Sequence, residues 1–192
     1  MSLTVEKCIE GWTNSLRQLK VKTDIVFFGD SLTYYGDYAS VFPDKVVCNL
    51  GLRGDTLEGM IYRVEQIKLV NPEVVYVLAG INDVAYCCEN EFKERYCALL
   101  DAIMYSHPEV RVVVQSILPV NDSEFSVNCY NKQIAKCNHQ IEVLAFKYGI
   151  QYLDTYSAYQ EAGELPIEMT IDGLHLKPES YCIWYEMLKN SQ

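Results

Sequence analysis

Basic residues are scarce in this sequence. It contains 16 Lys and Arg against 26 Asp and Glu, which gives a formal net charge of -10 at pH 7. Such an excess of negative charge repels phosphate backbones and anionic membrane surfaces, and no local cluster of Lys and Arg offsets it. We therefore expect no nucleic-acid partner.

Long hydrophobic runs are also missing. None approaches the roughly 20 apolar residues that are needed to cross a bilayer. The N-terminus, MSLTVEKCIEGW, has neither the basic region nor the apolar core of a signal peptide. We expect no transmembrane segment and a cytoplasmic location, and a secreted or periplasmic location stays open if a leader precedes this chain.

The sequence lacks the spacings that mark several common sites. It has no C-x-x-C, P-loop, H-E-x-x-H or strand-linked G-x-G-x-x-G, so we expect neither a metal ion nor a nucleotide or other cofactor. The absence of G-x-S-x-G excludes the larger α/β-hydrolase class. Its eight cysteines are scattered over a chain that is large enough to bury its own core, which predicts free thiols, most of them small core residues.

The size and composition are those of one soluble globular domain. The 192 residues contain 49% apolar and 22% charged residues, with no linker, repeat or low-complexity tract. We therefore expect a single domain over residues 1–192.

Five short apolar runs rich in β-branched residues predict strands. They lie at residues 23–29, 45–51, 73–80, 109–118 and 149–154. Strands without an alternating polar face suit a parallel sheet that is covered on both sides.

The segments between these runs have helical spacing. One predicted helix carries Leu57, Met60, Ile61, Val64 and Ile67. Asp55 or Thr56 can cap it, and Glu58 stands three residues after Asp55 as in a capping box.

Three more helices follow along the chain. Phe92 to Ile103 form an apolar stripe, a longer helix runs from about Val127 to Tyr148 with Gly149 as its stop, and Pro178 opens the last one. Alternating strands and helices predict a three-layer α/β/α sandwich with right-handed crossovers.

Polar residues follow three of the predicted strands. They are Asp30 with Ser31, the stretch from Arg53 to Thr56, and Asn82 with Asp83. Ligands of such sheets bind where the carboxyl ends of the strands meet the next loops. We therefore expect these residues to lie together at that rim of the sheet. Asp55 and Asp83 are expected to stabilise loops and helix starts there.

Ser31 needs a base before its hydroxyl can act as a nucleophile. Of the three histidines, His107 precedes a proline at a helix end and His139 lies in a helical stripe. His175 lies in a loop three residues after Asp172. A tight loop can place Asp172 on Nδ1 of His175 and leave Nε2 facing the serine.

Acyl transfer also needs hydrogen-bond donors for the developing oxyanion. The amide of Ser31, the unobstructed amide of Gly54 and the side-chain amide of Asn82 are candidates. The alternatives are that Gly51 and Gly54 only form a turn and that Asn82 only caps the next segment.

Four blocks of the sequence, GDSLT at 29–33, NLGLRGDT at 49–56, GIND at 80–83 and DGLHL at 172–176, resemble in order those of the SGNH or GDSL-type hydrolases. The run VVVQSILPVN at 112–121 is similar to the branch that includes platelet-activating-factor acetylhydrolases. The resemblance extends over nearly the whole chain.

The resemblance implies a flavodoxin-like, five-stranded parallel sheet of order 2-1-3-4-5. It implies Ser31 as nucleophile, His175 as base and Asp172 as its orienting partner. It also implies an oxyanion hole formed by the amides of Ser31 and Gly54 and the side chain of Asn82. Gly54 is favoured over Gly51 because it precedes the letters DT, as in the second block of the family.

These features predict an esterase that forms an acyl-serine and acts on a small-molecule ester without a cofactor. Short loops between the blocks favour a small acyl group, acetyl first, on a carbohydrate or small alcohol. A lysophospholipase or thioesterase is the nearest rival, and a binding module without turnover is a third reading. The oligomeric state is left open.

Two further positions are candidates for substrate binding. Arg53 either meets a polar or anionic part of the substrate or faces solvent. Tyr34 and Tyr35 follow the nucleophile and could flank the acyl pocket, although core packing is expected for at least one of them.

Overall fold

The structure is a computed structural model of the 192-residue chain, and it describes residues 3–19, 22–125 and 131–192. Five parallel strands form one sheet in the order β2-β1-β3-β4-β5, as the sequence predicted. The strands are β1 (Ile25–Gly29), β2 (Val47–Gly51), β3 (Val74–Leu78), β4 (Arg111–Gln115) and β5 (Gln151–Leu153). Gly29 pairs with Gly51 on one side and with Leu78 on the other, so the first three strands end level with one another.

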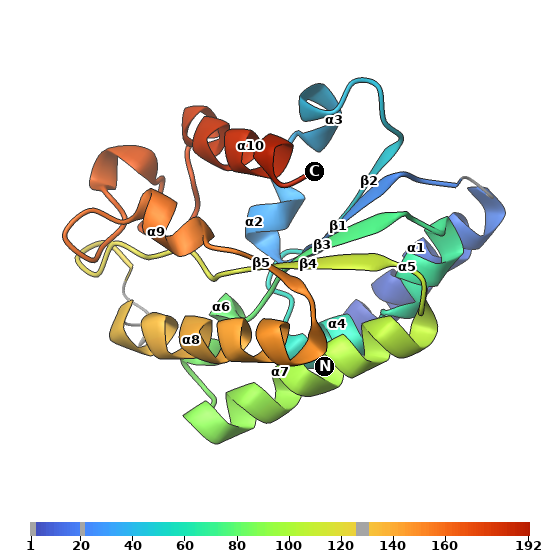
Figure 1. Cartoon of the computed structure of the whole chain (residues 1–192), viewed down its shortest axis with the longest axis horizontal. Coiled ribbons are helices and arrows are strands. Elements are labelled where there is room, and N and C mark those ends of the chain that lie inside the picture. The colour runs from blue at the N-terminus through green and yellow to red at the C-terminus, as the bar shows by residue number, and fades with distance from the viewer. Residues whose placement is uncertain (1–2, 20–21, 126–130) are drawn as a thin grey trace.

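Helices cover both faces of the sheet and produce the three layers seen in Figure 1. One face is covered by α1 (Leu3–Leu19), α4 (Leu57–Tyr62), α5 (Glu65–Val70), α6 (Ile81–Val84), α7 (Glu89–Ser106) and α8 (Asn131–Tyr148). The other is covered by α2 (Ser31–Tyr34), α3 (Tyr38–Val41), α9 (Thr155–Tyr159) and α10 (Tyr181–Asn190).

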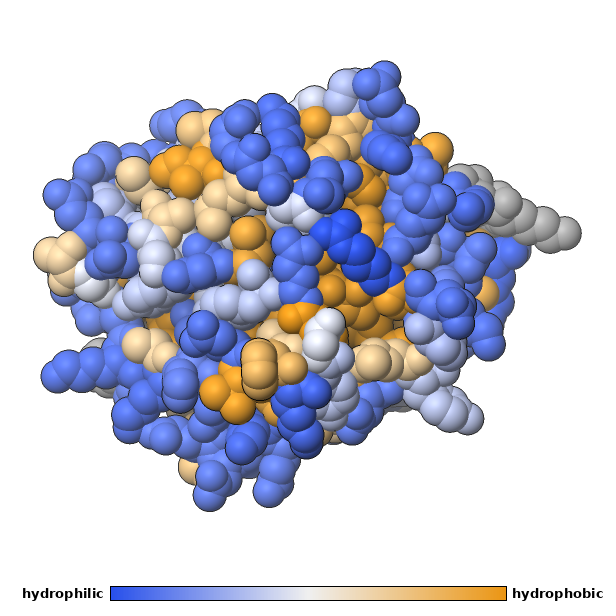
Figure 2. Space-filling view, in the orientation of Figure 1, coloured by the Kyte–Doolittle hydropathy of each residue, from blue (hydrophilic) through white to orange (hydrophobic). Residues whose placement is uncertain are grey.

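Alternate residues of each strand enter two separate hydrophobic cores. In β1, Val26 and Phe28 pack under α4, α5 and α7, whereas Ile25 and Phe27 pack under α3 and α10. All five residues of β1 and of β3 are buried, which is the expected state of central strands in a doubly covered sheet. In the space-filling view, hydrophobic residues are visible in the central band between the layers, and hydrophilic residues cover most of the outer parts (Figure 2).

The helix predicted after the second strand is interrupted. It is divided into α4 and α5 at Arg63, where Gln66 N donates to Arg63 O at 3.0 Å and Ile67 N to Val64 O at 3.1 Å. These bonds span three residues instead of four and tighten the chain at that point.

Thr56 is the N-cap of α4, and its hydroxyl accepts from Gly59 N at 3.2 Å. The capping box from Asp55 to Glu58 is therefore wrong. The Asp55 carboxylate instead accepts a hydrogen bond from Arg63 Nε, because a buried guanidinium requires a charged partner.

The later helices agree with their predictions. The apolar stripe from Phe92 to Ile103 is buried in α7. Gly149, at φ 65°, ends α8, whose predicted first residues, 127–130, lie outside the described ranges. Pro178 opens a 3-10 turn, η2 (Pro178–Ser180), that leads into α10, and a second one, η1 (Ile167–Met169), precedes it.

Other elements were not predicted, α1 among them. Its buried residues Ile9, Thr13 and Leu16 recur at helical spacing, which is the signal that could have revealed it. The helix packs on α5.

No disulfide joins the cysteines within the described ranges to one another, as the sequence predicted. Among them only Cys137 is buried, so the expectation that most are core residues is wrong. None of the helices in the described part of the chain is both long enough and apolar enough to cross a membrane.

Candidate active site

Ser31 stands at the junction of β1 and α2. Asp30 is the N-cap of α2, and its Oδ1 accepts from Leu32 N at 2.9 Å. A glycine is required just before it, because a Cβ at Gly29 would lie 2.4 Å from Leu78 O. Ser31 is buried, with 5% of its surface exposed.

The structure brings Ser31, His175 and Asp172 together in one hydrogen-bonded chain. Ser31 Oγ lies 2.9 Å from Nε2 of His175, and Nδ1 of the same ring lies 2.7 Å from Asp172 Oδ2. The His175 side chain is 27% exposed, so its ring borders the solvent on one side and the serine on the other. This arrangement fits a base held between an orienting carboxylate and a hydroxyl.

The loop that carries His175 is fixed by its own backbone. Thr170 and Leu176 form an antiparallel bridge, and the His175 carbonyl accepts from both Ile171 N and the Thr170 hydroxyl at 2.8 Å. Gly173 has φ 85°, and a Cβ there would lie 2.6 Å from Phe125 N. A glycine at the turn therefore lets the loop double back and places Asp172 beside the imidazole.

Hydrogen bonds control the ionisation of Asp172. Its Oδ1 accepts from the backbone N–H of His175 at 2.8 Å and of Leu174 at 3.1 Å. Partial burial acts to raise the pKa of Asp172, but these bonds and the His175 ring outweigh it and hold the pKa below its ordinary value. The carboxylate stays charged and can hold the ring in one orientation.

Asp30 has the opposite environment. Burial raises the pKa of Asp30 to about 7, and the neighbouring carboxyl groups of Asp55 and Asp83 add to the rise, against the backbone N–H of Leu32 and the charge of Arg63. Within the described part of the chain, its Oδ2 is buried without a hydrogen-bond partner. Asp30 caps the helix that bears Ser31 and changes its charge near pH 7.

The two glycines of the second block have different surroundings. Gly51 is buried, and a Cβ there would lie 2.2 Å from Tyr34 N, so this glycine allows β2 to approach α2. Gly54 is exposed at φ 71°, with open space where a side chain would be. No side chain obstructs its amide, which stays a predicted oxyanion donor.

Asn82 is the second residue of α6. This helix begins directly after Gly80, which has φ 117°. Its Nδ2 donates to Asp55 O at 2.8 Å, which ties the third block of the sequence to the second. An amide NH2 group has two N–H donors, and this bond uses one of them.

Asp83 and Asp55 stabilise the starts of the helices, as expected. Asp83 Oδ2 accepts from Leu57 N at 3.0 Å, and Asp55 Oδ1 accepts from Thr56 N at 3.1 Å. Burial raises the pKa of Asp83 to about 6, although the Leu57 amide and Arg95 act against it.

The tyrosines after Ser31 are not core residues, which corrects the expectation for them. Tyr34 is 51% exposed and Tyr35 48%. The Tyr35 ring meets the His175 ring edge to face, with the centroids 5.7 Å apart, and the Arg53 guanidinium lies 5.8 Å from the Tyr35 centroid. Of the two tyrosines that the sequence placed near the acyl pocket, Tyr35 is the one whose ring contacts His175.

The other histidines lie outside this cluster, as expected. His107 is the C-cap of α7, where its Nε2 lies 3.0 Å from Asn71 Oδ1. The His139 side chain is 75% exposed on α8. Across the described residues, no group of three or more His, Cys, Asp or Glu side chains is placed to hold a metal ion.

Arg63 was missed by the sequence reasoning. It is 1% exposed and pairs with Asp55 at 2.7 Å directly behind the second block. The available signal was its helical spacing with Met60 and Ile67, which places a charge on an apolar face.

Solved structures resemble this fold over most of its length. A candidate platelet activating factor from Streptococcus pneumonia is 25% identical, with a TM-score of 0.82, over 100% of this chain and 99% of that one. A GDSL-like lipase from Bacteroides thetaiotaomicron is 22% identical, with a TM-score of 0.79, over 96% and 95% of the two chains. The lipase/acylhydrolase from Enterococcus faecalis is 21% identical, with a TM-score of 0.75, over 88% and 94%.

The sequence comparisons give one clear assignment. No curated protein matches this chain. The model of the GDSL-like lipase/acylhydrolase family matches residues 27–183, which include all four sequence blocks. The chain therefore belongs to the GDSL-like lipase/acylhydrolase family and is an ester hydrolase.

Proposed function

We propose that the enzyme hydrolyses carboxylic esters in two steps through an acyl-serine on Ser31. The observation that carries this proposal is the hydrogen-bonded chain from Asp172 through His175 to Ser31, with links of 2.7 and 2.9 Å. A serine hydroxyl becomes a nucleophile when a neighbouring base can take its proton.

In the first step, Ser31 Oγ attacks the ester carbonyl carbon and its proton passes to Nε2 of His175. Asp172 stabilises the imidazolium that forms, and the leaving alcohol takes the proton from Nε2 when the tetrahedral intermediate collapses. In the second step, His175 takes a proton from water, the water oxygen attacks the acyl carbon, and the carboxylic acid leaves Ser31 with its hydroxyl restored.

The proposed oxyanion hole combines the amides of Ser31 and Gly54 with the side chain of Asn82. The open space at Gly54 and the remaining N–H of the Asn82 amide support this assignment. Donors fixed in advance stabilise the charge that develops on the carbonyl oxygen without having to reorganise.

We propose a short acyl group, specifically acetyl, on a carbohydrate or small alcohol as the substrate. The charged group of Arg53 and the half-exposed rings of Tyr34 and Tyr35 give the rim a polar and aromatic character that suits a sugar or a small polar alcohol. A second candidate is a lysophospholipase or thioesterase, because Ile171, next to Asp172, is 67% exposed and could contact a longer acyl chain.

Rates on nitrophenyl esters from acetate to decanoate test the proposal, with Ser31→Ala as the inactive control. We expect kcat/KM to fall with chain length and the Ser31→Ala enzyme to show no turnover above background. A rise with chain length would favour the second candidate. Absence of turnover by the unmodified enzyme on every ester, acetylated sugars included, would contradict a catalytic role and favour a binding module.

A further inference from the structure

Arg63 is a fully buried cation that lies directly behind the loops of the proposed site. Its side chain has no exposed surface. Nε donates to Asp55 Oδ2 at 2.7 Å, Nη1 to Leu50 O at 2.8 Å, and Nη2 to Gly29 O at 3.0 Å. The guanidinium thus makes direct bonds to three separate segments of the chain.

These three acceptors are the ends of the elements that carry the proposed catalytic groups. Gly29 is the last residue of β1, two positions before Ser31. Leu50 is the next-to-last residue of β2, and Asp55 directly follows Gly54. One planar side chain therefore links the end of the strand before Ser31 to the loop that carries a proposed oxyanion donor, in addition to the pairing of β1 with β2.

The third block is connected to the same centre. Asn82 Nδ2 donates to Asp55 O at 2.8 Å, so the residue that pairs with Arg63 also holds the other proposed oxyanion donor. Movement of Asp55 would displace the amide of Gly54 and the side chain of Asn82 together.

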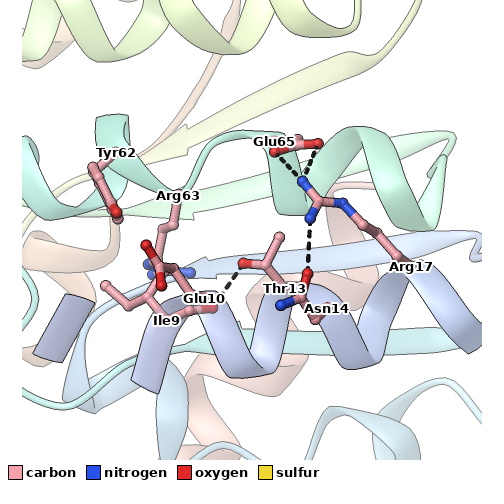
Figure 3. Close-up of a pocket in the computed structure, with 8 residues that line it drawn as sticks. All are labelled: Ile9, Glu10, Thr13, Asn14, Arg17, Tyr62, Arg63 and Glu65. Carbon is pink, nitrogen blue, oxygen red and sulfur yellow. Dashed lines mark hydrogen bonds and ion pairs between the residues drawn. The ribbon is translucent and has the colours of Figure 1, made fainter. Parts of the chain in front are cut away.

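Other contacts, to Gln66 and Phe28, also hold the Arg63 side chain in place. Its Nη1 donates to Gln66 Oε1 at 3.1 Å, and Gln66 Nε2 donates to the Thr13 hydroxyl of α1 at 3.0 Å. Its Cζ lies 4.3 Å from the centroid of the Phe28 ring. Thr13 and Arg63 both line a cavity of about 320 Å³. Figure 3 shows the lining residues, with Thr13 on α1 and Arg63 on the neighbouring segment.

Stability alone is a poor explanation for this arrangement. Desolvation offsets most of what a buried ion pair contributes, and well-packed apolar residues of similar volume are often as stabilising. A guanidinium differs from an apolar side chain in that its N–H groups point in fixed directions within one plane. That property matters where backbone segments must be held at a defined separation.

We infer that Arg63 is a positioning residue for catalysis, through which the Ser31 loop is held in register with Gly54 and Asn82. This inference rests on the proposed serine mechanism. Displacement of a catalytic group by about 1 Å can lower the rate by about 100-fold. The expected defect lies in kcat, because binding of the ground-state ester does not depend on the oxyanion donors.

Arg63→Lys retains the charge and removes the planar fork. We expect kcat on the best nitrophenyl ester to fall by about 10- to 100-fold with KM changed by less than about 3-fold, and labelling of Ser31 by a fluorophosphonate to slow in proportion. Ile103→Ala is the matched control. Ile103 is fully buried near the end of α7, shortly before the amino end of β4, whereas the proposed site lies at the carboxyl ends of the strands. Its truncation should lower the melting temperature and leave kcat unchanged.

Chemical rescue separates a lost guanidinium from general loosening of the fold. We expect Arg63→Ala to recover part of its kcat in methylguanidinium, at concentrations that leave the unmodified enzyme folded and fully active. Methylammonium at the same ionic strength should give no recovery, because it lacks the fork. The cavity beside Arg63 offers the small cation a way in.

The inference is overturned if folded Arg63→Lys turns over at the rate of the unmodified enzyme, or if its loss appears in KM alone. Should neither Arg63 variant fold, Gln66→Leu decides, since it keeps Arg63 and removes one acceptor and the link to Thr13. Several-fold lower kcat supports the inference, and unchanged kcat overturns it. Inactivity of the unmodified enzyme would instead contradict the proposed function.

Discussion

Two carboxyl groups lie close to Ser31 along different routes, that of Asp172 through the His175 ring and that of Asp30 as its neighbour in the chain, and their environments differ. The Asp172 side chain is 50% exposed and accepts hydrogen bonds from the His175 ring and from two backbone N–H groups. Asp30 is 1% exposed and accepts one, from Leu32 N. The pKa of Asp172 is lowered and that of Asp30 is raised to about 7.

The difference teaches that environment assigns separate roles to identical side chains. N–H donors that converge on Asp172 favour its charged form, whereas desolvation of Asp30 favours its neutral form. Titratable groups whose pKa values are shifted in opposite directions commonly have different acid–base roles in a site. We expect Asp172 to act as a charged partner of His175 and Asp30 to act as a helix cap that is neutral below about pH 7.

The largest effect should come from Asp172→Asn. The amide is nearly the same size as the carboxylate but cannot stabilise the imidazolium, and it favours the wrong tautomer of His175. We expect kcat to fall by about 10⁴-fold with the sheet intact, measured by steady-state kinetics and circular dichroism. A loss smaller than about 10-fold would show that the carboxylate is dispensable and would remove the contrast with Asp30.

Asn82→Ala tests the proposed oxyanion hole, which neither of the two carboxyl groups forms. Loss of one oxyanion donor should lower kcat by about 10²- to 10³-fold with little change in KM. Asn71→Ala serves as the control, because Asn71 is at φ 46° at the end of α5, before β3. It should lower thermal stability alone, and equal kcat losses in both variants would exclude a specific role for Asn82.

Asp30→Asn should change the pH dependence of stability more than activity. A carboxyl whose pKa rises on folding lowers the free energy of unfolding as pH rises from about 4 to about 7, by at most about 4 kcal/mol. We expect Asp30→Asn to flatten that fall, with a residual slope from Asp83, and to keep kcat within about 10-fold. Urea unfolding at several pH values measures it.

Asp172 should contribute a slope of the opposite sign. Its lowered pKa stabilises the fold above the ordinary carboxyl range, and that contribution is lost as pH falls through the lowered pKa. An Asp30→Asn enzyme with the same slope as the unmodified one would contradict the neutral-cap assignment.

The smallest effect is expected at Arg53, which offers a similar contrast with the buried Arg63. Arg53 is exposed, and within the described ranges no carboxylate pairs with it. Arg53→Gln should raise KM for an anionic ester such as a succinyl monoester by up to about 5-fold and leave a neutral propionyl ester unaffected. Equal effects on both esters would remove Arg53 from substrate recognition.

Much of the fold could be predicted because its signals are local. Continuous β-branched runs identify the strands, and the sheet order follows from the family resemblance. The meeting of Ser31 with His175 was also predictable, since parallel strands bring their carboxyl ends to one rim and Asp172 lies only three residues from the ring. These features depend on short stretches of sequence or on general topology.

The rest depends on contacts between distant residues. The break between α4 and α5 accompanies the bonds of Arg63 to Gly29 and Leu50, which no local periodicity encodes. The orientation of Tyr35 toward His175 depends on a loop more than a hundred residues away along the chain. Tertiary context overrides local pattern at both places.

Labelling with a fluorophosphonate, followed by mass analysis of the digested enzyme, tests the central claim most directly. The reagent requires a serine activated by a neighbouring base, so the account predicts one adduct, on the peptide that contains Ser31, with a much slower rate in His175→Ala. An adduct on a different peptide, or labelling of Ser31→Ala at the rate of the unmodified enzyme, would contradict it.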